Sequence, residues 1–205
     1  NNKPSKINIT CHYYKGPEKN EKTISLTYVR PLNNIPENFK IIAHRAGGRN
    51  SDRLPASENS IEMIKFAERL GANAIEIDVK LTKDKIPVLF HDENLSLRLI
   101  NESYLVGSLS NYTFEQLRTF VTLKNGGQIP SLEEALDTVL GATNISLVWL
   151  DIKSSGLIED VTKVQKKYVN KARAMKKNLE ILIGLPSEEA VSEYLTIKDK
   201  KDIPC

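Results

Sequence analysis

The stretch AIEIDVKLTKDKIPVLFHD at positions 74–92 limits most strongly what this chain can fold into. Side chains two apart on a strand point to the same face, so Glu76 and Asp78 share one face of a predicted strand. Two neighbouring carboxylates repel each other, and a hard divalent cation with oxygen ligands commonly relieves that repulsion. The alternative is a solvated face of an exposed edge strand, because E-x-D is a common tripeptide. The other face is aliphatic, with Ile75, Ile77 and Val79.

The second half of this stretch ends on His91 and Asp92. The run 80–87 before it is too short for a helix and rich in turn formers. A tight turn at Lys83-Asp84 predicts an antiparallel return with His91 opposite Glu76, and directly paired residues lie roughly 5 Å apart. In the alternative, a parallel return, both strands end on the same side of the sheet. Either arrangement predicts that His91 lies near the two carboxylates.

Length, charge and cysteine content exclude several classes of protein. The chain has 205 residues, enough for one sizeable core, and a net charge of +3 spread along the sequence. No stripe of basic and aromatic residues suggests a nucleic-acid partner. Cys11 and Cys205 form neither a disulfide framework nor a metal cluster, and no apolar run is long enough to span a bilayer. These features leave the oligomeric state open.

The chain begins at Asn1 rather than at Met, which is typical of a trimmed or processed product. No signal peptide is present in the sequence. Removal of an export signal would account for such a start, so we favour a periplasmic or extracellular location over a cytoplasmic one.

Residues 1–38 differ from the rest and predict a β-rich extension followed by a linker. The strand-like runs INITCHYY (7–14) and KTISLTYV (22–29) are separated by the turn-forming cluster KGPEKNE. The proline-containing segment PLNNIPEN follows as a linker. His12 is expected to be a surface strand residue rather than a ligand.

Residues 39–205 predict a second domain in which strands and helices alternate. Five strands are expected. Two of them are buried, a short one that begins at Phe39 and one at 146–153, and the others are two within 74–92 and one at 179–186. Capping-box patterns predict helices from Thr113 through Phe120 and from Ser131 through Leu140, and a further helix follows Ser187. The segment between Asp92 and Thr113 has no apolar period and is expected to be a loop.

Two further helices are predicted from apolar periodicity. The first has an apolar face and a glycine stop at Ile61, Ile64, Ala67, Leu70 and Gly71. The second is a basic amphipathic helix with Ile158, Val161, Val164, Tyr168, Ala172 and Met175 on its apolar face. Its lysines are expected to form a solvated outer face, and a membrane-surface role is the alternative.

Strands separated by helices predict a parallel α/β fold. Active sites in β/α barrels and open parallel sheets lie at the carboxyl ends of the strands. Polar residues gather at four such ends: His44-Arg45, Glu76-Asp78, His91-Asp92 and Asp151-Lys153. The loop after the first strand has neither a G-x-G-x-x-G pattern nor a P-loop, which disfavours a nucleotide-binding fold.

The chemistry of these strand ends is typical of a phosphoester hydrolase. His44 and His91 titrate near neutrality and suit proton transfer. Arg45 and Lys153 are cations that suit phosphate oxygens. Three hard oxygen ligands, which favour Mg²⁺ or Ca²⁺ over zinc, come from Glu76, Asp78 and Asp151.

Several motifs resemble the glycerophosphodiester phosphodiesterase family, a member of the PLC-like phosphodiesterase superfamily. They occur in the family's order from about Ile41 to Lys153: AHRAGG, SENSIEMIKFAERLGANAIEIDVKLTKDKIPVLFHDENL, GSLSNYTFEQL, IPSLEEAL and LDIK. The resemblance implies a TIM-type β/α barrel that uses a divalent metal, Ca²⁺ or Mg²⁺, to split glycerophosphodiesters into glycerol 3-phosphate and an alcohol. By motif it implies metal ligands at Glu76, Asp78 and Asp151, an acid–base pair at His44 and His91, and phosphate contacts at Arg45 and Lys153.

Three positions depart from the family's pattern. The usual HRG is His-Arg-Ala here, and PENT is the segment 57–60, SENS, which affects loop geometry rather than chemistry. The metal-binding residue of the family's E-I-K is Asp151, which keeps the charge on a shorter side chain. The same D-x-K pattern is seen in sphingomyelinase D enzymes, so a sphingomyelinase D-like or lysophospholipase D-like activity on a larger phospholipid is an alternative.

The length raises a further expectation. A β/α barrel typically needs about 250 residues, whereas five strands are predicted here and 20 residues follow Leu185. We therefore expect a barrel that is incomplete at its C-terminus, with open strand edges that favour association. A non-catalytic metal-binding module on the same fold is the alternative from another class, although every matched position is kept.

Overall fold

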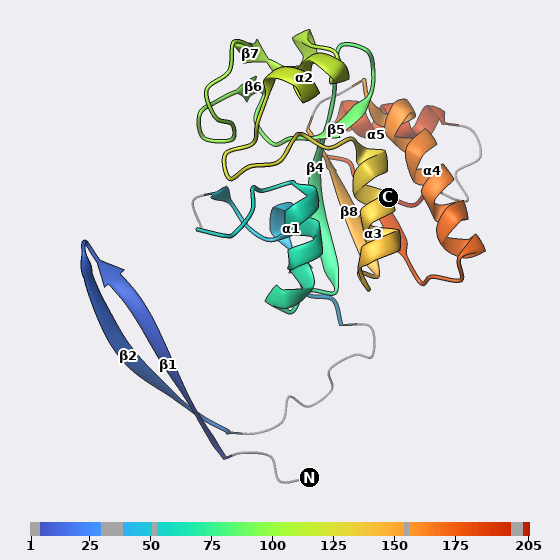
Figure 1. Cartoon of the computed structure of the whole chain (residues 1–205). Coiled ribbons are helices and arrows are strands. Elements are labelled where there is room, and N and C mark those ends of the chain that lie inside the picture. Colours follow the sequence, from blue (N-terminus) through green and yellow to red (C-terminus); the bar gives the residue numbers. More distant parts are fainter. Residues whose placement is uncertain (1–4, 30–38, 51–52, 154–155, 198–202) are drawn as a thin grey trace. The chain divides into compact units, whose positions relative to one another are not determined.

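The computed structural model describes residues 5–29, 39–50, 53–153, 156–197 and 203–205 (Figure 1). The chain divides into two compact units, residues 1–39 and 40–205. No helix in the described ranges is long and apolar enough to cross a bilayer. The expected linker at 31–38 lies outside the described residues.

The first unit is an antiparallel hairpin of β1 (Lys6–Lys15) and β2 (Glu18–Thr27). Lys15 pairs with Glu18, so the connection is only Gly16-Pro17, with Gly16 at φ 62°. Glycine adopts this left-handed conformation without strain, which permits the tight turn. The longer turn expected over 15–21 is therefore wrong. His12 lies on the strand surface, with Nε2 3.1 Å from Oε2 of Glu21.

The second unit contains a five-stranded sheet, which confirms the predicted parallel α/β class. Its parallel strands, in spatial order, are β3 (Ile42–Ala43), β4 (Ala74–Leu81), β8 (Leu147–Ile152) and β9 (Glu180–Gly184). β5 (Pro87–Leu89) pairs antiparallel with the end of β4. The helices are α1 (Ile61–Phe66), the 3-10 helix η3 (Ala67–Leu70), α3 (Leu132–Ala142), α4 (Ile158–Ala174) and α5 (Glu188–Thr196).

The helices cover one face of the sheet, and this packing leaves the other face for polar residues. Alternate residues of β4 and β8 enter the core that α1, α3 and α4 complete: Ile75, Ile77, Val79, Val148, Leu150 and Ile152. The residues between them point to the opposite face. Glu76, Asp78 and Asp151 therefore share the face that the helices do not cover.

Four apolar side chains in segments that were expected to be buried are exposed instead. Trp149 points away from the core and is 44% exposed. Leu70 is exposed because α1 tightens into η3 at Ala67, and Met175 is exposed because it follows the last residue of α4. The first strand is not buried: Ile42 lies on β3, which is an edge strand of the sheet.

The return from β4 to β5 is antiparallel, but its register differs from the expected one. Leu81 pairs with Pro87, and Thr82 N donates to Ile86 O, which leaves the three residues 83–85 in the turn itself. Lys85 adopts φ 64°, which accommodates the extra residue. A shift of one residue turns each side chain to the other face. Phe90 N accordingly donates to Asp78 O, so His91 does not pair with Glu76.

The segment between Asp92 and Thr113, expected to be a loop, contains short elements and joins the predicted helix α2 in a small cap beyond the end of β4 (Figure 1). The cap comprises β6 (Asn94–Leu95), β7 (Gly107–Ser108), the 3-10 helix η4 (Leu109–Asn111) and α2 (Phe114–Phe120). It has a core of its own, with Phe90, Leu99, Leu109, Leu117 and Ile129. Both predicted capping boxes, at Thr113 and at Ser131, are confirmed.

Candidate active site

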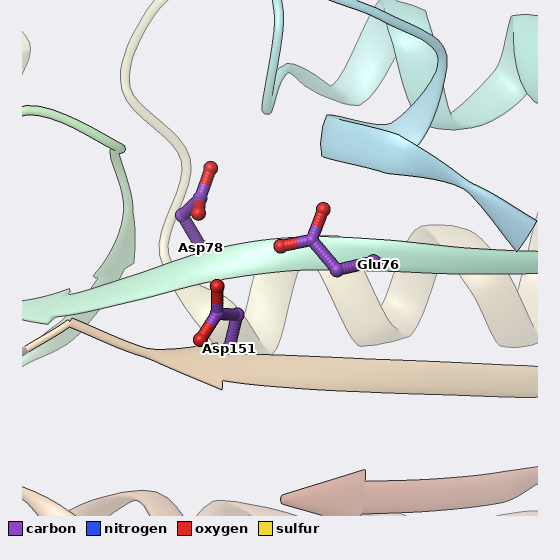
Figure 2. Close-up of side chains that lie close together, drawn as sticks. All are labelled: Glu76, Asp78 and Asp151. Atoms are coloured by element: carbon purple, nitrogen blue, oxygen red, sulfur yellow. The ribbon is translucent and has the colours of Figure 1, made fainter. Parts of the chain in front are cut away.

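Three carboxylates meet on the polar face of the sheet. Asp78 of β4 pairs in parallel register with Asp151 of β8, and Glu76 lies one strand period before Asp78. Figure 2 shows the three side chains directed toward one another from these two strands. One oxygen of each lies within 4.8 Å of the others. Carboxylate oxygens at this spacing can ligate a single cation.

The buried carboxylates of this cluster have the electrostatics of a cation site. Burial, reinforced by the charges of Asp78 and Asp151, raises the pKa of Glu76 to about 7, although a hydrogen bond from Arg45 N opposes the rise. Among the described residues, no hydrogen bond reaches Oε1 of Glu76 or Oδ1 of Asp78, and both atoms are buried. Buried oxygens without donors are rare and call for a ligand. An all-oxygen set fits a hard divalent cation such as Mg²⁺ or Ca²⁺.

Lys153 follows β8 and lies against the two aspartates. Its ammonium is 2.9 Å from Oδ1 of Asp78 and 2.5 Å from Oδ2 of Asp151. This ion pair partly compensates the charge of Asp78, although Oδ1 accepts no hydrogen bond from the described residues. Burial alone lowers the pKa of Lys153, but its contacts with Asp151 and Asp78 outweigh burial and raise it. Lys153 is therefore a stable cation at the site.

His44 and Arg45 follow β3 in the 3-10 helix η1 (His44–Ala46). The side chain of His44 is 61% exposed, and its Nε2 lies 3.8 Å from Oε2 of Glu76. Burial and then the charge of Arg45 lower the pKa of His44, so the imidazole is neutral near pH 7. His44, Arg45 and Gly48 line a hollow of about 580 Å³. His44 is thus an accessible proton acceptor beside the carboxylates.

Arg45 is buried and engaged within the protein. It adopts φ 53°, which turns its backbone N–H toward Glu76 at 2.7 Å. Its Nη1 donates to Oε1 of Glu58 at 2.7 Å, and its Nε lies 3.7 Å from Oδ2 of Asp78. Its guanidinium therefore supports the cluster directly, in addition to any contact with a substrate.

His91 makes its ion pair with Asp92 rather than with the carboxylates of the cluster. Its Nδ1 is 2.8 Å from Oδ1 of Asp92, which fixes one nitrogen of the ring. In the described part of the chain, no carboxylate of the cluster lies within ion-pair distance of His91. The structure brings the other predicted residues together more tightly than this one.

Sequence reasoning missed three residues that hold the site together: Glu58, Asn59 and Arg98. Asn59 donates to Oδ2 of Asp78 at 2.7 Å and accepts from its backbone N–H at 3.1 Å. Arg98 donates to both oxygens of Asp92 and of Glu58. Burial raises the pKa of Asp92, but hydrogen bonds from Arg98 and His91 prevail and hold it well below its usual range. A continuous polar chain thus runs from Arg45 through Glu58, Arg98 and Asp92 to His91.

Comparison with known proteins identifies relatives of this arrangement. The sequence profile of the glycerophosphoryl diester phosphodiesterase family matches residues 44–202. A glycerophosphodiester phosphodiesterase of Caldanaerobacter subterraneus subsp. tengcongensis is 33% identical over 139 residues, which cover 62% of this chain and 53% of the relative. The chain therefore spans about half the length of that curated relative.

Solved structures share the fold over most of this chain. A glycerophosphodiester phosphodiesterase from Parabacteroides distasonis is 25% identical with a TM-score of 0.55, covering 80% of this chain and 63% of that one. An Oleispira antarctica phosphodiesterase, solved in complex with the product sn-glycerol-3-phosphate, is 23% identical with the same TM-score and the same two coverages. The latter likeness is one of fold alone.

Proposed function

Because the chain belongs to the glycerophosphoryl diester phosphodiesterase family, we propose that it hydrolyses glycerophosphodiesters to glycerol 3-phosphate and an alcohol. The observation that carries this proposal is the meeting of three carboxylates within 4.8 Å, two of them with buried oxygens that lack donors. We also propose that the parallel sheet forms part of a TIM-type β/α barrel, which the similarity to the Parabacteroides structure supports.

Glu76, Asp78 and Asp151 would hold the divalent cation, Ca²⁺ or Mg²⁺. When bound, such an ion withdraws charge from a phosphoryl oxygen and stabilises the charge that develops there. Lys153, 2.9 Å from Asp78, supplies a second positive charge to the phosphate. Arg45 holds Glu76 and Asp78 in position and turns its guanidinium toward the same face.

His44 and His91 are the proposed acid–base pair. Partial burial is the main cause of the lowered pKa of His44. The imidazole is therefore neutral near pH 7 and able to accept a proton. Asp92 fixes Nδ1 of His91, which leaves Nε2 for proton transfer. One histidine takes a proton from the nucleophile, which is water or the glycerol 2-hydroxyl, while the other gives a proton to the leaving alkoxide. If the 2-hydroxyl attacks, water then opens the cyclic phosphate to give glycerol 3-phosphate.

The test is incubation of the whole chain with glycerophosphocholine, with EDTA and then with Ca²⁺ or Mg²⁺ in excess. We expect glycerol 3-phosphate and choline in equal amounts, and only with the metal. Release of phosphocholine and glycerol would assign cleavage to the wrong ester bond and overturn the proposal. Release of choline from lysophosphatidylcholine or from sphingomyelin, without turnover of glycerophosphocholine, would favour the phospholipid alternative. Metal binding without any turnover would favour the non-catalytic module.

A further inference from the structure

One loop of the cap exposes three large apolar side chains to solvent. Tyr104 is 96% exposed, Val106 71% and Leu97 62%, and all three belong to the connection between β6 and β7. They border a groove of about 570 Å³, with Leu95, Ile100 and Leu105 as its other apolar walls. A contiguous exposed apolar patch of this kind usually marks an interaction surface.

This loop is held in place by hydrogen bonds rather than left free. Asn101 N donates to Thr122 O at 2.9 Å, and the Ser103 hydroxyl donates to Phe120 O at 2.9 Å. Ser103 Oγ also accepts from Leu105 N at 3.1 Å. The apolar side chains are therefore presented from an ordered support, so that docking costs little further conformational entropy.

The β4–β5 connection, which carries Lys83 and Lys85, is hydrogen-bonded to the apolar loop through Tyr112. Tyr112 joins the two segments: its hydroxyl bonds to the backbone of Val106, and its carbonyl accepts from Lys83 N at 2.8 Å. Lys83 and Lys85 are exposed, and within the described ranges neither ammonium has an ion-pair partner. The opposing charges are Glu102 in the loop and Asp84 between the two lysines, whose carboxylate accepts hydrogen bonds from Thr82 Oγ1 and Phe114 N.

We propose that this part of the cap docks on the surface of an anionic lipid bilayer. Tyr104, Val106 and Leu97 enter the boundary between headgroups and acyl chains, while Lys83 and Lys85 contact anionic headgroups. Interfacial membrane binding typically combines apolar side chains with lysines. The buried apolar area and the attraction of the lysines to anionic lipids each contribute to the binding free energy. A stable protein interface needs roughly 1,200 Å² or more of buried surface, which three side chains on one loop do not provide.

The cap lies beyond the end of β4, the strand that carries Glu76 and Asp78 (Figure 1). Docking through the cap loop therefore presents the carboxyl-terminal edge of the sheet to the membrane surface. The proposal itself does not depend on catalysis, because vesicle binding is measured without any substrate. Failure of either proposal thus leaves the other to be judged on its own experiment.

The experiment is co-sedimentation of the whole chain with vesicles of phosphatidylcholine alone or mixed with phosphatidylserine. We expect binding to the mixed vesicles that salt weakens. Tyr104→Ser with Val106→Ser should weaken it by roughly tenfold or more, because each side chain forfeits its apolar burial. Lys83→Gln and Lys85→Gln should each cost about fivefold on the mixed vesicles only, and Glu102→Gln should strengthen binding there.

The matched control is Leu195→Ser on α5, where an apolar side chain is 62% exposed, as Leu97 is. This control should leave binding unchanged, and circular dichroism confirms that each variant is folded. Absence of wild-type binding to both kinds of vesicle would overturn the proposal. So would undiminished binding by the folded Tyr104/Val106 double variant, or an equal loss in the Leu195 control.

Discussion

Asp78 and Asp151 lie in direct register on two parallel strands and share one cation, the ammonium of Lys153. Period-two alternation then adds the carboxylate of Glu76 to the same face. Without a metal, Lys153 is the nearest positive charge to Asp78. We expect the stability of the site to depend on the balance between this lysine and a bound divalent ion.

Replacing Lys153 with methionine should make the stability of the chain depend on metal. The substitution leaves Asp78, which is fully buried, without its nearest cation, and breaking a buried pair in this way costs about 3 kcal/mol. We expect a lower melting temperature in EDTA and recovery on addition of Ca²⁺. The control is Lys171→Met, which removes an exposed pair with Asp137 and should change little. Equal destabilisation with and without Ca²⁺ would contradict this role.

The raised pKa of Glu76, which burial causes above all, predicts a pH dependence of stability in the metal-free chain. The folded state holds a proton up to about pH 7, whereas the unfolded state releases it near the ordinary value of 4.5. The contribution is therefore complete below pH 4.5 and is lost as the pH rises to 7. Urea denaturation in EDTA should show this slope, and Glu76→Gln should remove it. Excess Ca²⁺ should reverse the slope in the wild type, because it binds the ionised form.

Asn59 should prove structurally costly to replace. Its side chain makes two buried hydrogen bonds to Asp78, and its backbone has φ 57°, a conformation that asparagine tolerates better than alanine. Asn59→Ala should lower the free energy of unfolding by about 2–4 kcal/mol, because both groups of Asp78 lose their partner. Urea denaturation checks this against Asn170→Ala on the exposed face of α4. A loss below 0.5 kcal/mol, on the order of a surface change, would contradict it.

Arg98 should act on catalysis through His91, since it connects Asp92 to Glu58. Arg98→Met should lower kcat by up to roughly 10²-fold, the lower end of what general acid–base catalysis contributes, with little change in KM, because Asp92 loses the partner that holds it against His91. Arg98→Lys should restore part of the loss. The matched control is Arg118→Met, which breaks a comparable pair with Glu134 that joins α2 to α3. An unchanged kcat per folded molecule, together with a reduced melting temperature, would contradict this role. The loss of activity in Arg98→Met would then come from unfolding alone.

Much of the fold followed from local patterns. Capping boxes fixed the starts of α2 and α3, and the alternation of strands and helices predicted the parallel sheet. The cluster of Glu76, Asp78 and Asp151 follows from period-two alternation and from parallel strands ending at one edge. Neither inference requires knowledge of distant contacts.

The errors arise where loops determine the geometry. The left-handed conformation of Lys85 adds one residue to the β4–β5 connection, and that single residue moves His91 out of the predicted pairing. Glu58 and Asn59 reach the site only through a loop with positive φ, and Arg98 through a segment without periodicity. Such positions carry no sequence signal that distinguishes a buried partner from an exposed polar residue.

The central claim is tested most directly by turnover of glycerophosphocholine as a function of free Ca²⁺ or Mg²⁺, for the wild type, Asp151→Asn and His91→Ala. We expect no turnover in EDTA and saturable recovery with either ion. Asp151→Asn should need at least roughly tenfold more metal, because one charged ligand is lost. His91→Ala should keep the wild-type metal dependence with turnover lower by roughly 10²–10⁴-fold. Turnover that resists EDTA, or one metal curve shared by the wild type and Asp151→Asn, would contradict the account.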